Sequence, residues 1–242
     1  MPTNGLKMTP VKRPQVPKEV IRPGPAGKDW CGYPHKKLLD QVAAELTTLV
    51  GQPTEEKVWV SPGGRDMVVR FTLRPGCFPV SNYGTPTVWV THSNNRRRSL
   101  KFFLGVSPVI DYQKDCFVVT DVIDPVPKFT AAVDVPNVVH SAATRLVEKG
   151  QQDLAYAIGA LTAIDIRDTE RDLVLMEVGR RNILPWSKVG KVYPDVQTAW
   201  DLVEEFGVQL ATESPWHVPE QGLLFWRLLG DTLKAGETAR AA

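Results

Sequence analysis

The chain has 242 residues, of which 43% are hydrophobic and 23% are charged, and its net charge is +2. This length and composition are typical of a globular chain that buries a core without disulfides or metals. No apolar run reaches the roughly 18 residues of a transmembrane helix, and the N-terminus lacks the apolar segment of a secretory signal. The sequence therefore argues against a membrane-spanning or secreted protein.

The cysteines are few, odd in number and far apart in the sequence. They are Cys31, Cys77 and Cys116. Such spacing predicts neither a disulfide framework nor a zinc ribbon, because a ribbon needs closely spaced cysteine pairs. We expect free thiols in the cytoplasm or in another reducing compartment, such as a virion. No pattern in the chain calls for a cofactor.

Charge is distributed unevenly along the chain. Residues 1–101 hold 16 basic and 7 acidic residues, a net charge of +9, whereas residues 102–242 hold 13 basic and 20 acidic residues, a net charge of −7. A polarised chain of this kind can attract phosphates with its first part, or pair with copies of itself. We therefore expect nucleic acid and a homo-oligomer as partners, and no membrane.

The first 29 residues differ from the rest of the chain. They contain almost no large apolar side chains, and six of the 20 prolines lie within the first 25 residues. Because proline lacks a backbone donor and has a fixed φ, we expect neither a helix nor a paired strand in this stretch. The prediction is a disordered or extended basic arm, residues 1–29, followed by a single domain, residues 30–242.

The first part of this domain, residues 52–127, is predicted to be rich in strands. A helix is expected before it, over 34–50, and two β-hairpins are expected at 58–73 and 88–104. Val-Trp-Val opens both hairpins, 30 residues apart. We interpret them as neighbours in one antiparallel sheet, with chance similarity of two amphipathic hairpins as the alternative. A fifth strand is predicted over 116–123.

The second part of the domain, residues 136–236, is predicted to be helical, with a loop over 180–194. Apolar periodicity predicts helices over 137–149, 151–166, 169–178, 196–206 and 219–235. Gly150 is expected to separate the first two helices and Gly236 to end the last. Strands followed by helices indicate the α+β class: an antiparallel sheet of two similar hairpins plus a fifth strand, packed against C-terminal helices.

Basic residues of the arm and of the second hairpin tip are the candidate contacts to nucleic acid. The arginine run lies between two apolar strands, so it should project into solvent, where guanidinium groups can bind phosphates in pairs of hydrogen bonds. The candidate residues are Lys12, Arg13, Lys18, Arg22, Arg96, Arg97, Arg98 and Lys101. The alternatives are a solvated turn that discourages aggregation and an arm that only solubilises.

Two tryptophans, Trp59 and Trp89, occupy equivalent positions in the two hairpins. Each points away from its flanking valines, because side chains alternate along a strand. We expect them either to pack in a second layer on the sheet or to form exposed platforms for a base or a partner.

No catalytic motif is evident in the chain. The histidines, His35, His92, His140 and His217, are scattered, and no serine has the glycine pattern of a nucleophile elbow. The run 165–172 places aspartates on one helix face, but the arginines between them favour a salt-bridged surface over a metal site. The sequence therefore predicts no catalytic residue and no metal ligand.

These features favour binding or assembly over catalysis. The first hypothesis is a non-enzymatic protein whose basic arm and arginine-rich hairpin tip contact nucleic acid or an acidic partner, as in a viral or phage structural protein. The first alternative is an enzyme of the hydrolase type, with a site built from scattered His, Cys or Asp residues. The second alternative is a protein-binding adaptor or chaperone whose arm folds on its partner.

Overall fold

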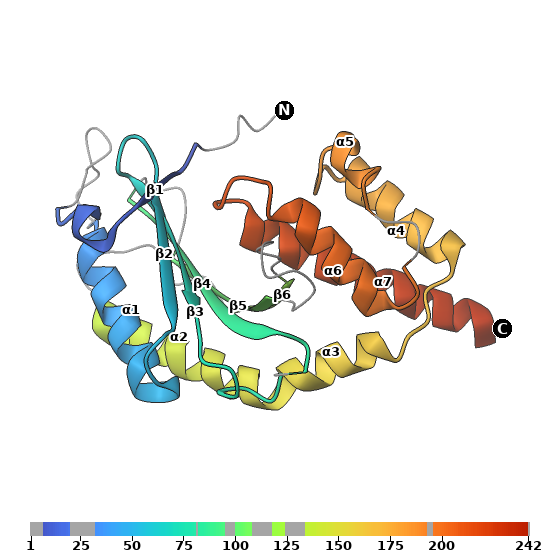
Figure 1. Cartoon of the computed structure of the whole chain (residues 1–242), viewed down its shortest axis with the longest axis horizontal. Coiled ribbons are helices and arrows are strands. Elements are labelled where there is room, and N and C mark those ends of the chain that lie inside the picture. Colours follow the sequence, from blue (N-terminus) through green and yellow to red (C-terminus); the bar gives the residue numbers. More distant parts are fainter. Residues whose placement is uncertain are drawn as a thin grey trace.

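The structure is a computed structural model that describes residues 7–19, 32–80, 82–94, 100–107, 118–123, 134–192 and 196–241, with backbone only for 118–123 and 235–241. It has the predicted α+β architecture. The sheet lies between helices α1 and α2 on one side and helices α6 and α7 on the other (Figure 1).

The sheet contains six antiparallel strands in the order of the sequence. They are β1 Thr9–Val11, β2 Glu55–Val60, β3 Asp66–Thr72, β4 Thr85–Ser93, β5 Lys101–Ser107 and β6 Val118–Ile123. The β2–β3 and β4–β5 hairpins are the two that the sequence predicts. They are neighbours, because β3 pairs with β4, and β6 is the predicted fifth strand.

The N-terminal arm is not wholly free of structure, which corrects the prediction for residues 7–19. Its strand β1 pairs with β2, and Pro10 lies opposite Trp59. Proline is tolerated there because β1 is an edge strand with a partner on one side only. The arm then forms a 3-10 turn, η1 Arg13–Gln15, and buries Val16 in the core. Residues 1–6 and 20–31 lie outside the described residues.

The helices follow the predicted pattern with local differences. They are α1 His35–Val50, α2 Val135–Lys149, α3 Ala155–Thr162, α4 Asp168–Arg180, α5 Trp186–Val189, α6 Ala199–Leu210 and α7 Val218–Ala241. The predicted loop at 180–194 thus contains the short helix α5. The last helix continues past Gly236. No helix in the described part of the chain combines the length and the apolar character of a membrane span.

Helix α2 ends before Gly150, as the sequence predicts, but Gly150 does not interrupt the helical path. A π-helical turn, η2 Gly150–Leu154, joins α2 to α3 instead. The Phe78 ring packs against this glycine so closely that a Cβ there would lie 2.6 Å from the ring. Glycine is therefore present here because of a tertiary contact rather than as a helix terminator.

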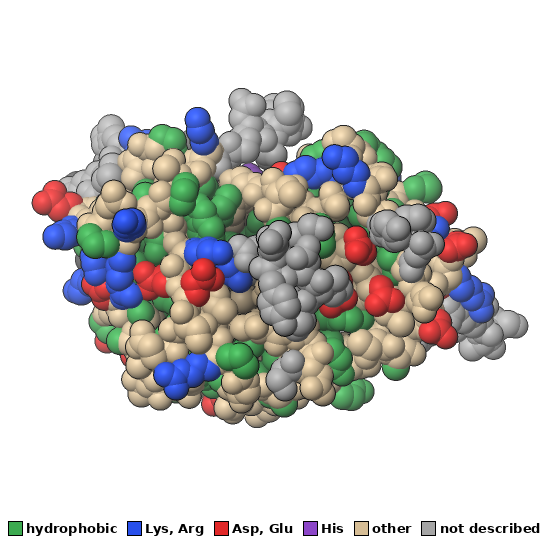
Figure 2. All heavy atoms as spheres, in the orientation of Figure 1, with side chains coloured by type: hydrophobic (Ala, Val, Ile, Leu, Met, Phe, Trp, Pro, Cys, Tyr) green, Lys and Arg blue, Asp and Glu red, His purple; other side chains and the backbone are tan. Residues whose placement is uncertain are grey.

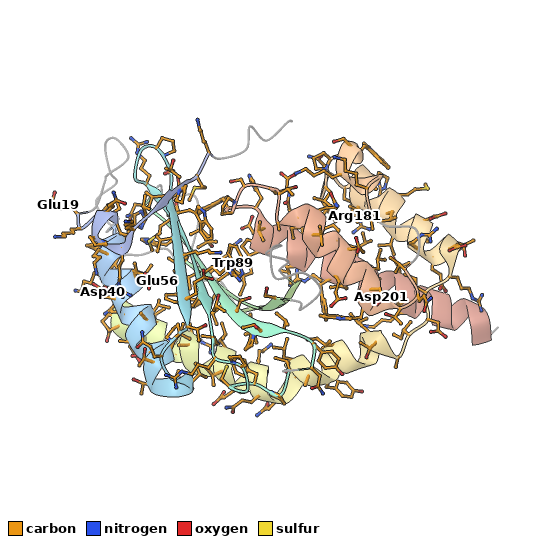
Figure 3. The ribbon with its side chains drawn as sticks, in the orientation of Figure 1. Glu19, Asp40, Glu56, Trp89, Arg181 and Asp201 are labelled. Atoms are coloured by element: carbon orange, nitrogen blue, oxygen red, sulfur yellow. The ribbon has the colours of Figure 1, made fainter. Side chains whose placement is uncertain are left out.

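One core joins the sheet to the helices. The face of β4 that carries Val88, Val90 and His92 is the one that α1 covers, since His92 contacts His35 of α1. The opposite face carries Trp89, which faces α6 and α7 (Figure 3). Alternation along each strand thus buries apolar side chains on both faces, as the burial of five consecutive residues of β5 also indicates.

Candidate nucleic-acid interface

One end of the sheet brings together segments that are far apart in the sequence. The β2–β3 turn, residues 61–65, lies beside the end of β4, because the Asn94 N–H donates to the Arg65 carbonyl at 2.8 Å. Strand β1 begins at the same end, because Thr9 pairs with the last residue of β2. We call this end, formed by residues 61–65 and 92–94, the turn end; it is uppermost in Figure 1.

A pair of buried histidines ties the first residue of α1 into the turn end. His35 and His92 are 0% exposed, and their Nδ1 atoms lie 2.7 Å apart. The Gly64 carbonyl, 3.1 Å from His35 Nε2, can only accept, so Nε2 carries a proton. A neutral His35 therefore accepts at Nδ1 from the Nδ1–H of His92.

Burial keeps both imidazole rings uncharged. Desolvation lowers the pKa of His35 from 6.5 to about 4, against smaller opposing effects that include the Gly64 carbonyl and Asp66. Desolvation, and then repulsion from His35, holds the pKa of His92 well below its usual value. At neutral pH the pair is consequently a neutral hydrogen-bonded bridge between α1, the β2–β3 turn and β4.

Further buried hydrogen bonds hold the end of β4 in place. The Ser93 hydroxyl donates a hydrogen bond to the carboxylate of Asp66. The backbone N–H of Asp66 in turn donates to Ser61 Oγ at 3.1 Å. The Asn94 side chain accepts from the Tyr33 N–H at 3.0 Å and donates to the Tyr33 carbonyl at 3.1 Å. These bonds hold Asn94, the last residue before the β4–β5 connection, against Tyr33, which lies just before α1.

This cluster contains a serine, a histidine and an aspartate, the residue types of a hydrolase triad, but they are not arranged as in a triad. In a nucleophilic triad, the serine hydroxyl donates to an imidazole that a carboxylate orients. Here Ser93 donates directly to Asp66, and His35 donates to a backbone carbonyl. All of these side chains are buried. In this conformation the cluster connects elements of the fold and does not face a substrate.

The predicted site residues have different positions in the structure. Lys12 and Lys18 are exposed on the arm beside the sheet. Arg13 pairs with Asp40 of α1 at 2.9 Å and with Glu56 of β2 at 2.7 Å, so its charge already has acidic partners. Figure 3 labels Asp40 and Glu56, which lie beside the arm at the left of the view.

Lys101, at the start of β5, likewise has an acidic partner, because its Nζ lies 2.6 Å from Glu220 of α7. The other four candidates, Arg22, Arg96, Arg97 and Arg98, lie outside the described residues. The residues that bound the arginine run are described. Asn94 is fixed at the turn end, and Leu100 is buried in the core.

The sequence did not indicate that Arg65, Lys36 and Lys37 belong to the same region. Arg65 is exposed in the β2–β3 turn, Lys36 pairs with Asp40, and Lys37 lies 5.3 Å from the centre of the Tyr33 ring. The position of Arg65 could have been predicted from the two similar hairpins in the sequence. Two neighbouring hairpins of one antiparallel meander have their turns at the same end, so the sequence predicts Arg65 beside the β4–β5 connection.

Basic side chains outnumber acidic ones around the turn end. Residues 7–19, 35–40 and 56–66 together hold eight basic and four acidic residues. Figure 2 shows Lys and Arg side chains gathered on this side of the molecule, with acidic side chains among them. The acidic side chains Asp40 and Glu56 pair with Arg13, which leaves exposed lysines on the arm and on α1.

The two hairpin tryptophans stack on each other. The rings of Trp59 and Trp89 are nearly parallel, at 3°, with centroids 5.8 Å apart. Trp89 is buried and Trp59 is half-buried. The pair therefore packs in the layer between the sheet and the C-terminal helices, as in the prediction of a second layer on the sheet. Trp89 is not an exposed platform.

Comparison of the chain with protein-family models, with curated proteins and with solved structures finds no match. The residues of the turn end are therefore the basis for a functional assignment.

Proposed function

We propose that this protein is a non-enzymatic binding protein that contacts the phosphates of nucleic acid with the turn end of its sheet. The contact surface consists of the arginine run of the β4–β5 connection, Arg65 of the neighbouring turn, and the exposed lysines of the arm and α1. Guanidinium groups bind phosphate oxygens in pairs of hydrogen bonds, and the lysines add charge without fixed geometry.

The observation that carries this proposal is the convergence of basic segments that the sequence keeps apart. The hydrogen bond from Asn94 to the Arg65 carbonyl holds the last residue before the β4–β5 connection beside the β2–β3 turn. The pairing of Thr9 brings the arm to the same end, and His35 brings the start of α1. The arm, the start of α1 and the β2–β3 turn thus share one end of the sheet with Asn94, the residue that leads into the β4–β5 connection. We therefore expect a phosphate backbone to contact several basic segments at this end at once.

The rigid attachment of this end supports binding of an extended ligand. The buried histidine bridge and the Asn94–Tyr33 hydrogen bonds fix the start of the β4–β5 connection, so less freedom is lost when the arginines bind. Phosphate contacts of this kind position a protein on nucleic acid without reading its sequence. We therefore propose binding with little sequence preference and a strong dependence on salt.

Replacing Arg96, Arg97 and Arg98 together by Ala is expected to weaken binding of a labelled single-stranded oligonucleotide roughly 10- to 100-fold at low salt. The reason is the loss of up to three phosphate contacts, each of which contributes about one unit to the slope of log K against log salt. Fluorescence anisotropy at several salt concentrations measures both quantities, with single-stranded RNA and duplex DNA as parallel ligands.

The matched control removes the same charge elsewhere. Arg74, Arg145 and Arg227 are exposed and lie outside the turn end, so replacing all three by Ala should leave binding within about threefold of the unchanged protein. Equal losses in the two triple variants would show that net charge alone acts. An unchanged protein that binds none of the nucleic acids at low salt, yet binds an acidic protein, would overturn the nucleic-acid assignment.

A further variant tests the part of the surface that only the structure revealed. Arg65→Ala with Lys37→Ala is expected to weaken binding roughly 3- to 10-fold and to lower the salt slope by about one to two units. Both side chains are exposed, and neither has an acidic partner in the ion pairs of the described residues. Binding that stays within twofold would restrict the interface to the arginine run.

A further inference from the structure

The N-terminal arm is held against the rest of the protein by a small number of contacts. Strand β1 pairs with β2 over three residues, and Val16 is buried in the core. The N–H of Lys36, in the first turn of α1, donates to the Pro17 carbonyl at 3.1 Å. We call residues 9–17, which make these contacts, the strap; it is the dark blue segment beside β2 in Figure 1.

The backbone of the strap adds little to this attachment. Three of the residues in the strap are prolines, which have no N–H to donate. One of them, Pro10, is the central residue of β1, and both Thr9 and Pro10 are exposed. Val16 is the only fully buried side chain in the described part of the arm. A segment with so few buried contacts opens at a lower cost in free energy than the rest of the fold.

Arg13 supplies the charged part of the attachment. Its Nη1 lies 2.7 Å from Glu56 Oε2 of β2. Its Nη2 and Nε lie 2.9 Å and 3.3 Å from Asp40 Oδ1 of α1. One guanidinium group thus bridges carboxylates on two different elements, so Arg13 holds the strap to the sheet and to the helix at once.

Glu56 depends on this contact more than Asp40 does. The Glu56 side chain is 19% exposed, whereas that of Asp40 is 48% exposed and also pairs with Lys36. Burial raises the pKa of Glu56, against the opposing charges of Arg13 and Lys36. Departure of Arg13 would deprive a half-buried carboxylate of its ion pair. The strap therefore stays closed in the absence of a competing anion.

A phosphate group is an anion that can compete for Arg13. Its oxygens accept from the forked donors of a guanidinium group in the same paired geometry as a carboxylate. The arm attracts such groups, because residues 7–19 hold four basic residues and one acidic residue, a net charge of +3. Since β1 begins at the turn end, phosphates bound there compete with Glu56 and Asp40 for Arg13.

From these contacts we infer that the strap opens when nucleic acid binds, and that Arg13 exchanges Glu56 and Asp40 for phosphates. In the free protein the closed strap is autoinhibitory, because it withholds an arginine from the interface. Opening also frees Lys12 and Lys18 to follow the phosphate backbone away from the sheet. The inference rests on the proposed function and adds a regulated step to it.

Hydrogen–deuterium exchange measured by mass spectrometry tests the opening of the strap. With a saturating single-stranded DNA oligonucleotide, peptides that cover residues 7–17 are expected to exchange at least about threefold faster than in the free protein. Peptides that cover residues 61–65 are expected to exchange no faster. An arm that exchanges at the same rate or more slowly with DNA bound would overturn the inference and leave the proposed function standing. A protein that binds neither DNA nor RNA would overturn both.

Asp40→Asn with Glu56→Gln removes the carboxylates that hold Arg13. Without ligand, exchange over residues 7–17 is expected to rise at least about threefold, and the affinity for the oligonucleotide is expected to rise roughly 3- to 10-fold. Adding Arg13→Ala should return the affinity to about that of the unchanged protein while exchange stays fast, because the strap is open but the phosphate contact is lost. Unchanged exchange in the double variant would overturn the role of Arg13.

Arg171 of α4 provides the matched control. It pairs with Asp168 at 2.9 Å and with Asp172 at 3.0 Å, and α4 lies at the right of Figure 1, away from the turn end. Asp168→Asn with Asp172→Asn removes the same charge and also separates an arginine from two carboxylates. This variant should bind within about twofold of the unchanged protein and leave exchange over residues 7–17 unaltered. Equal tightening in the two double variants would show that net charge alone acts and would overturn the inference. Circular dichroism of each variant confirms that it is folded.

Discussion

Lowering the pH from 7 to 4 is expected to reduce the free energy of unfolding by about 3 kcal/mol through His35 alone. The folded pKa of His35 is about 4 and its ordinary value is 6.5. Between these values the unfolded chain binds a proton that the folded protein does not, so stability falls as the pH falls from 6.5 toward 4. His92, whose pKa is also lowered, adds to the loss in the same direction.

The geometry of the bridge explains why a second proton is unfavourable. The Nε2–H of His35 donates to Gly64, and its Nδ1 accepts from His92. A proton added at His35 Nδ1 would put a charge in a fully buried site, and His92 would have to give up its Nδ1–H, because two donors cannot share the 2.7 Å contact. Acid therefore weakens the connection between α1, the β2–β3 turn and β4.

Denaturant unfolding at pH values between 7 and 4.5 measures this effect. Replacing His35 and His92 together by Gln should lower stability at pH 7, because well-packed rings are lost, and should flatten the dependence on pH. Val90→Ala, on the same buried face of β4, is the control: it should lower stability without changing the slope against pH. An unchanged slope in the double variant would assign the acid sensitivity to other groups.

Gly84→Ala is expected to destabilise the fold by more than about 3 kcal/mol. Gly84 precedes β4 with φ of +147°, a conformation that residues with a Cβ rarely adopt. A Cβ atom there would also lie 2.1 Å from the Ser107 carbonyl oxygen and 2.8 Å from Val106 Cγ1. The clash involves backbone of β5, so it cannot be relieved by a side-chain rotation and must displace the β4–β5 pairing.

Gly51→Ala separates the two causes of this loss. Gly51 ends α1 with φ of +87°, and a Cβ there would meet nothing within 4 Å. Its substitution should therefore cost only the backbone strain, about 1–2 kcal/mol. Equilibrium unfolding in guanidinium chloride compares the two variants. Losses of the same size would show that the close approach of β5 to Gly84 relaxes without cost.

Much of the architecture follows from local patterns in the sequence. Helix α1 and the two hairpins were predictable because apolar residues recur at the helical period in one and at the strand period in the others. The repetition of Val-Trp-Val also indicated that the hairpins are neighbours, as the pairing of β3 with β4 confirms. Because these signals come from residues a few positions apart, the surrounding fold does not alter them.

Parts of the chain with weak local signals were assigned less well. The arm was predicted to lack paired strands, yet β1 forms because an edge position tolerates Pro10 and the core accepts Val16. Gly150 was predicted to separate two helices, yet the chain stays helical through it, and the close packing of the Phe78 ring explains why a glycine is needed there. In both cases the intrinsic helix or strand preference contributes little free energy, and burial against residues distant in the sequence outweighs it.

The sequence by itself determined the α+β class, the order of strands and helices and the separation of positive from negative charge, because composition and periodicity are local properties. Only the tertiary structure decided which charged segments meet at the turn end, that His35 and His92 form a buried bridge, and that Arg13 pairs with Asp40 and Glu56. The histidines are 57 residues apart, and no periodic pattern specifies contact across such a separation. Such contacts arise when elements pack to bury apolar surface, which sets the position of every polar group they carry.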